Sequence, residues 1–133
     1  MNHGDQRRSS DGIAIVELAI CLPIIVLILL ATIEACEMLQ LQQNVATTAY
    51  EGARIGIMPG AEAAKVQLQC KMLLDDRSIT NYTISTSPSD LSTASQGDQI
   101  TVTVDADCVS NSVLGGVFFQ GRTINESVVM RAE

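Results

Sequence analysis

The feature that most constrains this chain is an apolar run from Ile13 to Ile33 that contains a single charged residue, Glu17. The run has 21 residues, and a helix needs roughly 20 residues to cross the hydrocarbon core of a bilayer. Because the apolar region of a cleaved secretory signal has only about 7–15 residues, the run predicts a membrane-spanning helix. An ionised carboxylate in hydrocarbon costs about 3 kcal/mol or more and is usually functional there, so Glu17 calls for an explanation.

The basic residues around this run predict its orientation. Arg7 and Arg8 precede the run, and the next basic residue beyond it is Arg54. Since positive charges mark the cytoplasmic side, we expect the N-terminus to be cytoplasmic and the C-terminal part to be extracytoplasmic.

Composition limits the function classes that remain. The chain has 133 residues, a formal charge of -7 and a pI of about 4.5, so it has no basic field for phosphate backbones, and nucleic acid is not an expected partner. A membrane helix also leaves few residues for a soluble core, which must therefore form one small domain.

The helix is expected to continue beyond the membrane. Good helix formers follow Ile33 and neither Pro nor Gly occurs before Gly52, whereas Met58–Gly60 is a strong stop. A helix from Ile13 to Gly56 would be about 66 Å long at 1.5 Å per residue, and Pro23 is a possible kink.

The remaining residues predict a second helix and a small antiparallel sheet, an α+β fold. Residues 61–76 have helical apolar spacing, and residues 100–106 alternate strictly between apolar and polar, as a half-buried strand does. Residues 78–86 predict a weaker strand and residues 123–131 a third. The apolar face expected of the second helix consists of Ala64, Leu68 and Met72 with Val66, Leu73 and Leu74.

A stripe of small residues on the long helix has two interpretations. Ala46, Ala49, Ala53 and Gly56 lie three and four residues apart, so they share one helix face where another backbone could approach closely. The stripe could pack on the protein's own sheet or on a partner, and the sequence favours neither.

The four cysteines divide by position. Cys21 and Cys36 lie in and at the end of the apolar run and are expected to be small packing residues. Cys70 and Cys108 both fall in the exported domain, so in an oxidising compartment they are a candidate disulfide that would stabilise the domain by about 2–4 kcal/mol. Two free, buried thiols are the alternative.

No catalytic or metal-binding motif stands out. The single histidine is His3, and no CxxC, Gly-rich phosphate loop or HExxH occurs. Asp75 with Asp76, and Asp105 with Asp107, are expected to be solvated charges without calcium-loop spacing. We therefore expect no enzyme activity, cofactor, metal or small-molecule substrate.

The N-terminal third resembles a known family. A short polar leader ending in Gly12, an apolar residue after it and a glutamate five positions on are similar to the type IV prepilin signal. More specifically, the motifs resemble the TadE-like family of minor pseudopilins: Gly-x-Ala-x-Val-Glu at 12–17, Leu-Pro at 22–23, Ile-Glu at 33–34, the segment Glu51 to Gly56, and the tail 127–133.

This resemblance implies assembly rather than catalysis. It implies that residues 1–12 are a leader cleaved by a prepilin peptidase between Gly12 and Ile13, 13–35 a transmembrane helix, 36–57 its extracytoplasmic continuation and 58–133 a small α+β pseudopilin domain. Glu17 would then pair with the N-terminal amine of a neighbouring subunit. The implied partners are other pilins or pseudopilins, the pilus assembly platform and the bacterial inner membrane, and the implied role is assembly of a tight-adherence (Flp-type) pilus for adhesion and biofilm formation.

Alternatives remain open at this point. An uncleaved, single-pass, membrane-anchored binding module would share the anchor and the domain, with Glu17 merely reaching toward the cytoplasmic interface. A pseudopilin of a type II secretion system would share the same features.

Overall fold

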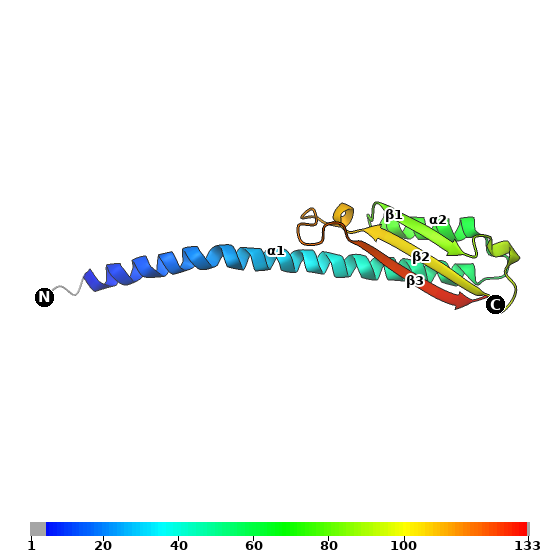
Figure 1. The fold of residues 1–133 in the computed structure, drawn as a ribbon, viewed down its shortest axis with the longest axis horizontal. Helices are drawn as coiled ribbons and strands as arrows, with labels where there is room; N and C mark the ends of the chain where they lie inside the picture. Colours follow the sequence, from blue (N-terminus) through cyan, green and yellow to red (C-terminus); the bar gives the residue numbers. More distant parts are fainter. Residues whose placement is uncertain (1–4, 133) are drawn as a thin grey trace.

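The computed structural model describes residues 5–132, and the first four residues of the expected leader lie outside the described residues. It contains two helices, α1 (Asp5–Gly56) and α2 (Ala63–Asp76), and three strands, β1 (Tyr82–Ser87), β2 (Gln99–Asp107) and β3 (Thr123–Arg131). Figure 1 shows a small domain built around the C-terminal half of α1, with the other half extending away from it as a rod. The expected α+β fold, with a long helix, a short helix and a three-stranded antiparallel sheet, is confirmed.

The long helix α1 begins earlier than the sequence predicted. It starts at Asp5 rather than near Ile13, so most of the polar leader continues the helix. Pro23 lies inside α1 without ending it, although a proline removes one backbone hydrogen bond. The helix ends at Gly56 because Pro59 disfavours helical geometry in the residue before it and Gly60 has a positive φ of 75°.

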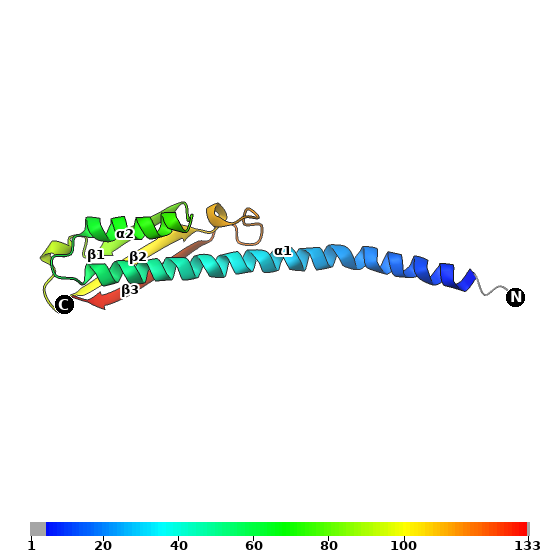
Figure 2. The ribbon, with the colours of Figure 1, turned by 180° about the vertical axis from the view of Figure 1, so that it is seen from behind.

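The sheet is antiparallel throughout, in the order β1-β2-β3. Residue Val104 of β2 pairs with Ile84 of β1 and with Glu126 of β3, which fixes the register on both sides. Figure 2 shows α1 and α2 on the same side of the sheet. The alternating residues of β2 that face the helices form the centre of the core, and all of them are buried: Ile100, Val102, Val104 and Ala106.

The orientation of α2 differs from the expected one. Its buried residues are Val66, Cys70 and Leu74, four residues apart, whereas Leu68 and Met72 are each 59% exposed. The helix face that contains Val66, Cys70 and Leu74 is turned inward because Cys70 packs against Gly52 of α1. A Cβ at that glycine would lie 2.5 Å from Cys70 Sγ. A close approach of this kind is available only where one helix lacks a side chain.

The small-residue stripe of α1 packs inside the domain. Ala49 and Ala53 are fully buried, and a Cβ at Gly56 would lie 3.2 Å from the side chain of Ile100. Of the two interpretations left open by the sequence, packing on the protein's own sheet is therefore the correct one.

Candidate functional site

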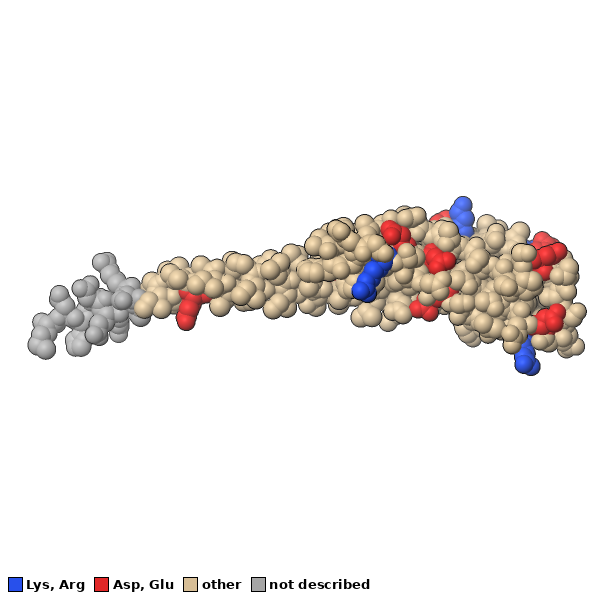
Figure 3. Space-filling model, in the orientation of Figure 1, with Lys and Arg blue, Asp and Glu red and all other residues tan. Residues whose placement is uncertain are grey.

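The N-terminal half of α1 is an apolar surface that nothing in the described structure covers. Every residue from Gly12 to Leu29 is exposed, including Ile13 at 63% and Leu27 at 58%. An 18-residue window of this helix has a mean hydropathy of 3.1, and none of that window is buried inside the protein. On the face that Figure 3 shows, the coloured part of this rod carries one acidic side chain and no basic one. The helix is thus long and apolar enough to be a membrane span.

Glu17 is the single charge on this surface between residues 13 and 33. Among the described side chains it has no hydrogen-bond or salt-bridge partner: the two ion pairs found there, Arg54–Glu51 and Lys65–Glu62, lie in the C-terminal domain. The fold of this chain therefore supplies no counter-charge for Glu17 within its described residues.

Gly12 has no structural role that the described residues reveal. It lies within α1, and a Cβ added to it would meet nothing within 4 Å. Glycine in a helix interior is about 1 kcal/mol less favourable than alanine, so a glycine here needs a reason other than packing or backbone conformation. Gly52 and Gly56, in contrast, are each required by a close neighbour.

A cluster of hydrogen-bonded side chains lies where α1 leaves the apolar run. Glu34 is 2% exposed, and its carboxylate accepts hydrogen bonds from the backbone N–H of Phe118 at 3.1 Å and of Phe119 at 3.3 Å. One turn further, Glu37 accepts bonds from the Ser112 hydroxyl at 3.0 Å and from the Val113 N–H at 3.2 Å.

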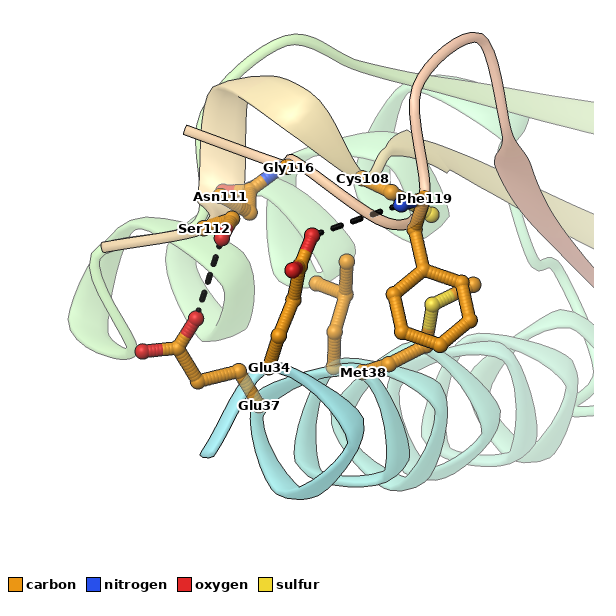
Figure 4. A pocket seen from close by; sticks show the side chains of 9 residues that line it. Glu34, Glu37, Met38, Cys108, Asn111, Ser112, Gly116 and Phe119 are labelled. Atoms are coloured by element: carbon orange, nitrogen blue, oxygen red, sulfur yellow. Dashed lines mark hydrogen bonds between the residues drawn. The ribbon is translucent and has the colours of Figure 1, made fainter. Parts of the chain in front are cut away.

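These two carboxylates hold the β2–β3 loop, residues 108–122, against α1. Figure 4 shows both side chains reaching from the helix to the loop. The cavity between them, lined also by Met38 and Phe119, has a volume of about 10 Å³. This volume is at the lower limit for one water molecule, so the cavity is a packed contact rather than a ligand site.

The sequence indicated only part of this contact. Glu34 appeared there as a family motif, without a role, and Glu37 was not singled out. The available signal was two carboxylates immediately after an apolar run, together with a distant uncharged segment, residues 109–121, that contains Gly115 and Gly116. Their partnership depends on the strand register and could not be read from spacing.

The start of the β2–β3 loop is fixed by a third carboxylate. Asp107 accepts hydrogen bonds from the hydroxyl of Ser110 at 2.6 Å and from its N–H at 2.8 Å. These bonds to the ionised form hold the pKa of Asp107 below its usual value, the hydroxyl bond contributing most.

In the described residues no group of three or more His, Cys, Asp or Glu side chains is arranged to hold a metal ion.

The structure does not bring the two cysteines of the candidate disulfide together. Cys70 and Cys108 are both buried free thiols. Cys70 packs beside Gly52 at the level of Val102, while Cys108 lies six residues further along the chain, about 20 Å at the rise of a strand. Burial raises the pKa of Cys70 to about 11 and raises that of Cys108 as well, where the charge of Asp107 adds to the effect.

Comparison with known proteins supports the resemblance seen in the motifs. Residues 12–54 match the family model described as TadE-like protein, a segment that includes Gly12, Glu17, Glu34 and the helix stretch packed in the domain. No curated protein and no solved structure matches the chain. The segment from Gly12 to Arg54 is therefore TadE-like, and the family resemblance drawn from the sequence is confirmed over those residues.

Proposed function

We propose that this protein is a minor pseudopilin of a tight-adherence (Flp-type) pilus, cleaved by a prepilin peptidase and acting in pilus assembly. The observation that carries the proposal is Glu17, a lone carboxylate on an exposed apolar helix with no partner among the described side chains. The TadE-like match over residues 12–54 supports a pilus-associated role of a non-enzymatic kind.

In the proposed processing step, water hydrolyses the peptide bond between Gly12 and Ile13. The bond breaks to leave a carboxylate on Gly12 and a new amine on Ile13, which becomes the mature N-terminus. The absence of any packing neighbour at Gly12 supports this assignment, because the fold does not explain the glycine. A small, open residue fits the need of a peptidase for access to the backbone.

The new amine gives Glu17 a counter-charge. Leaving one ion alone in hydrocarbon is costly, whereas two opposite ions in contact offset part of that cost. We propose that Glu17 pairs with the Ile13 amine of a neighbouring subunit. Such a pair forms only when adjacent helices have the correct axial stagger, so it would select subunits that are in register.

The same proposal places the protein in the bacterial inner membrane. The apolar half of α1 is the span, with residues 1–12 in the cytoplasm and the domain outside, as the positions of Arg7, Arg8 and Arg54 favour. Its partners there are the prepilin peptidase, other pilins or pseudopilins and the assembly platform, and its role is in adhesion and biofilm formation.

The first experiment is peptide mapping of the protein isolated from its own membranes. A mature start at Ile13 is expected. A start at Met1 or Asn2 would contradict processing and would favour the alternative function, an uncleaved membrane-anchored binding module.

The second experiment tests the charge pair by Glu17→Val in cells that lack the natural copy. We expect the variant to reach the membrane in normal amount but to reduce sheared surface pili strongly. Glu51→Ala is the matched control, since it removes a partly exposed carboxylate from the same helix. The partner of Glu51 is Arg54, 3.7 Å away. Normal piliation with Glu17→Val would refute the pairing role.

A further inference from the structure

The β2–β3 loop carries an exposed apolar tip that the proposed function does not use. Residues 109–121 contain no charged side chain, and they include both phenylalanines of the chain. Within the tip, residues Val113–Phe118, three side chains are well exposed: Val113 at 87%, Val117 at 64% and Phe118 at 51%. Such a concentration of exposed apolar groups on so small a domain marks a contact surface.

The height of this tip along α1 is fixed by hydrogen bonds. Phe118 is bonded to Glu34 and Val113 to Glu37, so the tip lies beside the first turn of α1 after Ile33. Figures 1 and 2 both show the loop extending past the end of the sheet along α1, toward the N-terminal half of the helix. The tip is therefore the part of the domain nearest to the proposed membrane span.

The length of the span places this point at the membrane surface. The 21 residues from Ile13 to Ile33 extend about 32 Å as a helix, close to the roughly 30 Å thickness of the hydrocarbon core. Glu34 and Glu37 then lie within the interfacial layer, where apolar side chains bury about 5–10 Å deep.

The polar groups of the loop are arranged to suit this layer. Both carboxylate oxygens of Glu34 and one oxygen of Glu37 accept hydrogen bonds from the loop, and these bonds lower the cost of placing the two carboxylates near lipid. At the C-terminal end of the loop, the guanidinium of Arg122 lies 5.6 Å from the ring centroid of Phe119. It is a cation at the level expected for lipid phosphates.

We propose that the tip of the β2–β3 loop, Val113–Phe118, inserts into the outer interface of the bilayer beside the point where α1 leaves it. This second contact would fix the tilt and rotation of the domain on the membrane. The inference rests on the membrane anchoring in the proposed function, but not on cleavage or on the Glu17 pair.

The test uses tryptophan as a depth probe, because the chain has no tryptophan of its own. Phe118→Trp in the full-length protein is reconstituted in phosphatidylcholine vesicles brominated either near the headgroup or near the end of the acyl chain. Leu27→Trp, in the span, is the membrane control. Leu68→Trp is the matched exposed control, since Leu68 is 59% exposed on α2, two residues from Cys70, which packs beside Gly52. Gly52 lies about 28 Å beyond Ile33 along α1, at the rise of a helix.

We expect the Phe118→Trp emission to shift to the blue and to lose more intensity with bromine near the headgroup than with bromine deep in the chain. The Leu68→Trp emission should not respond to either lipid. If Leu27→Trp is quenched and Phe118→Trp behaves like Leu68→Trp, the loop is in water and this inference is overturned while the anchoring stands.

Two other outcomes also overturn it. A blue shift of Phe118→Trp without quenching, growing with the protein-to-lipid ratio, would mean that a second copy of the chain covers the tip. Failure of Leu27→Trp to be quenched would contradict the membrane anchoring itself, and the insertion of the loop with it.

Discussion

The contact between Glu34 and the β2–β3 loop gives a prediction whose size can be worked out from the structure. Glu34→Ala removes the acceptor of two backbone N–H groups, those of Phe118 and Phe119. A hydrogen bond to a charged group contributes about 1.5–3 kcal/mol. The substitution also removes the cost of burying the carboxylate, which is 2% exposed, so we expect a net loss nearer 2 kcal/mol than the sum of both bonds.

This loss should be local. The tip of the loop is bonded to α1, through Val113 to Glu37 and through Phe118 to Glu34. The start of the loop is held separately, by hydrogen bonds between Asn111 and Thr80. The core around Val102 lies at the level of Gly52, 18 residues further along α1 than Glu34. We therefore expect the opening of the loop, rather than global unfolding, to become easier. A decrease of about 2 kcal/mol corresponds to roughly 30-fold faster amide exchange at Phe118 and Phe119, since 1.4 kcal/mol is a factor of ten.

The assay is hydrogen exchange on the full chain in nanodiscs, resolved to peptides. Glu51→Ala is the control, because it removes a different carboxylate from the same helix. Glu51 pairs with Arg54 at 3.7 Å, and an ion pair of this kind contributes less than about 1 kcal/mol to stability. The reasoning is refuted if the loop amides exchange no faster in Glu34→Ala than in the control, or if the amides of β2 accelerate equally.

Two further predictions concern the packing of α2 and the two buried cysteines. Gly52→Ala should destabilise the domain by about 1–3 kcal/mol, because the new Cβ would lie 2.5 Å from Cys70 Sγ. Chemical unfolding measures this loss. Gly12→Ala is the control and should not destabilise the domain, because its new Cβ would have no neighbour within 4 Å. A Gly52→Ala protein as stable as the control would show that α2 shifts freely. Cys70 and Cys108 should both titrate as free thiols in denaturant without reductant. In the folded protein, Cys70 should react with iodoacetamide at pH 8 about 100-fold more slowly than an ordinary thiol, because its pKa is raised from 9.0 to about 11. The thiolate is the reactive form, so its rate should rise as the pH approaches 11, and a bridged pair or an ordinary rate at pH 8 would contradict the structure.

The sheet shows how much of the fold the local sequence pattern can predict. Residues 100–106 alternate strictly, and the structure has β2 over Gln99–Asp107 with the expected face buried. The strand expected over residues 123–131 has those same bounds as β3. The weaker strand expected over 78–86 begins only at Tyr82, because Ser78 and Asn81 have positive φ values of 57° and 51°, and a strand cannot form through that conformation.

The second helix shows where local pattern fails. The apolar residues of α2 are spread around the helix. Their spacing alone therefore could not decide whether the face with Leu68 or the face with Cys70 is buried. The choice depends on Gly52 of α1, a residue 18 positions away from Cys70 that leaves room for the sulfur.

The sequence by itself determined the long helix, its apolar half, the isolated charge of Glu17 and the fold class, because these depend on composition and on periodicities within one segment. Only the tertiary structure decided that the small-residue stripe faces the protein's own sheet, that Cys70 and Cys108 lie far apart, and that Glu34 and Glu37 hold a loop some 75 to 85 residues away. The physical reason is that hydrogen bonds and side-chain packing act over a few ångströms in space, while the register that brings such groups together is set by the whole core.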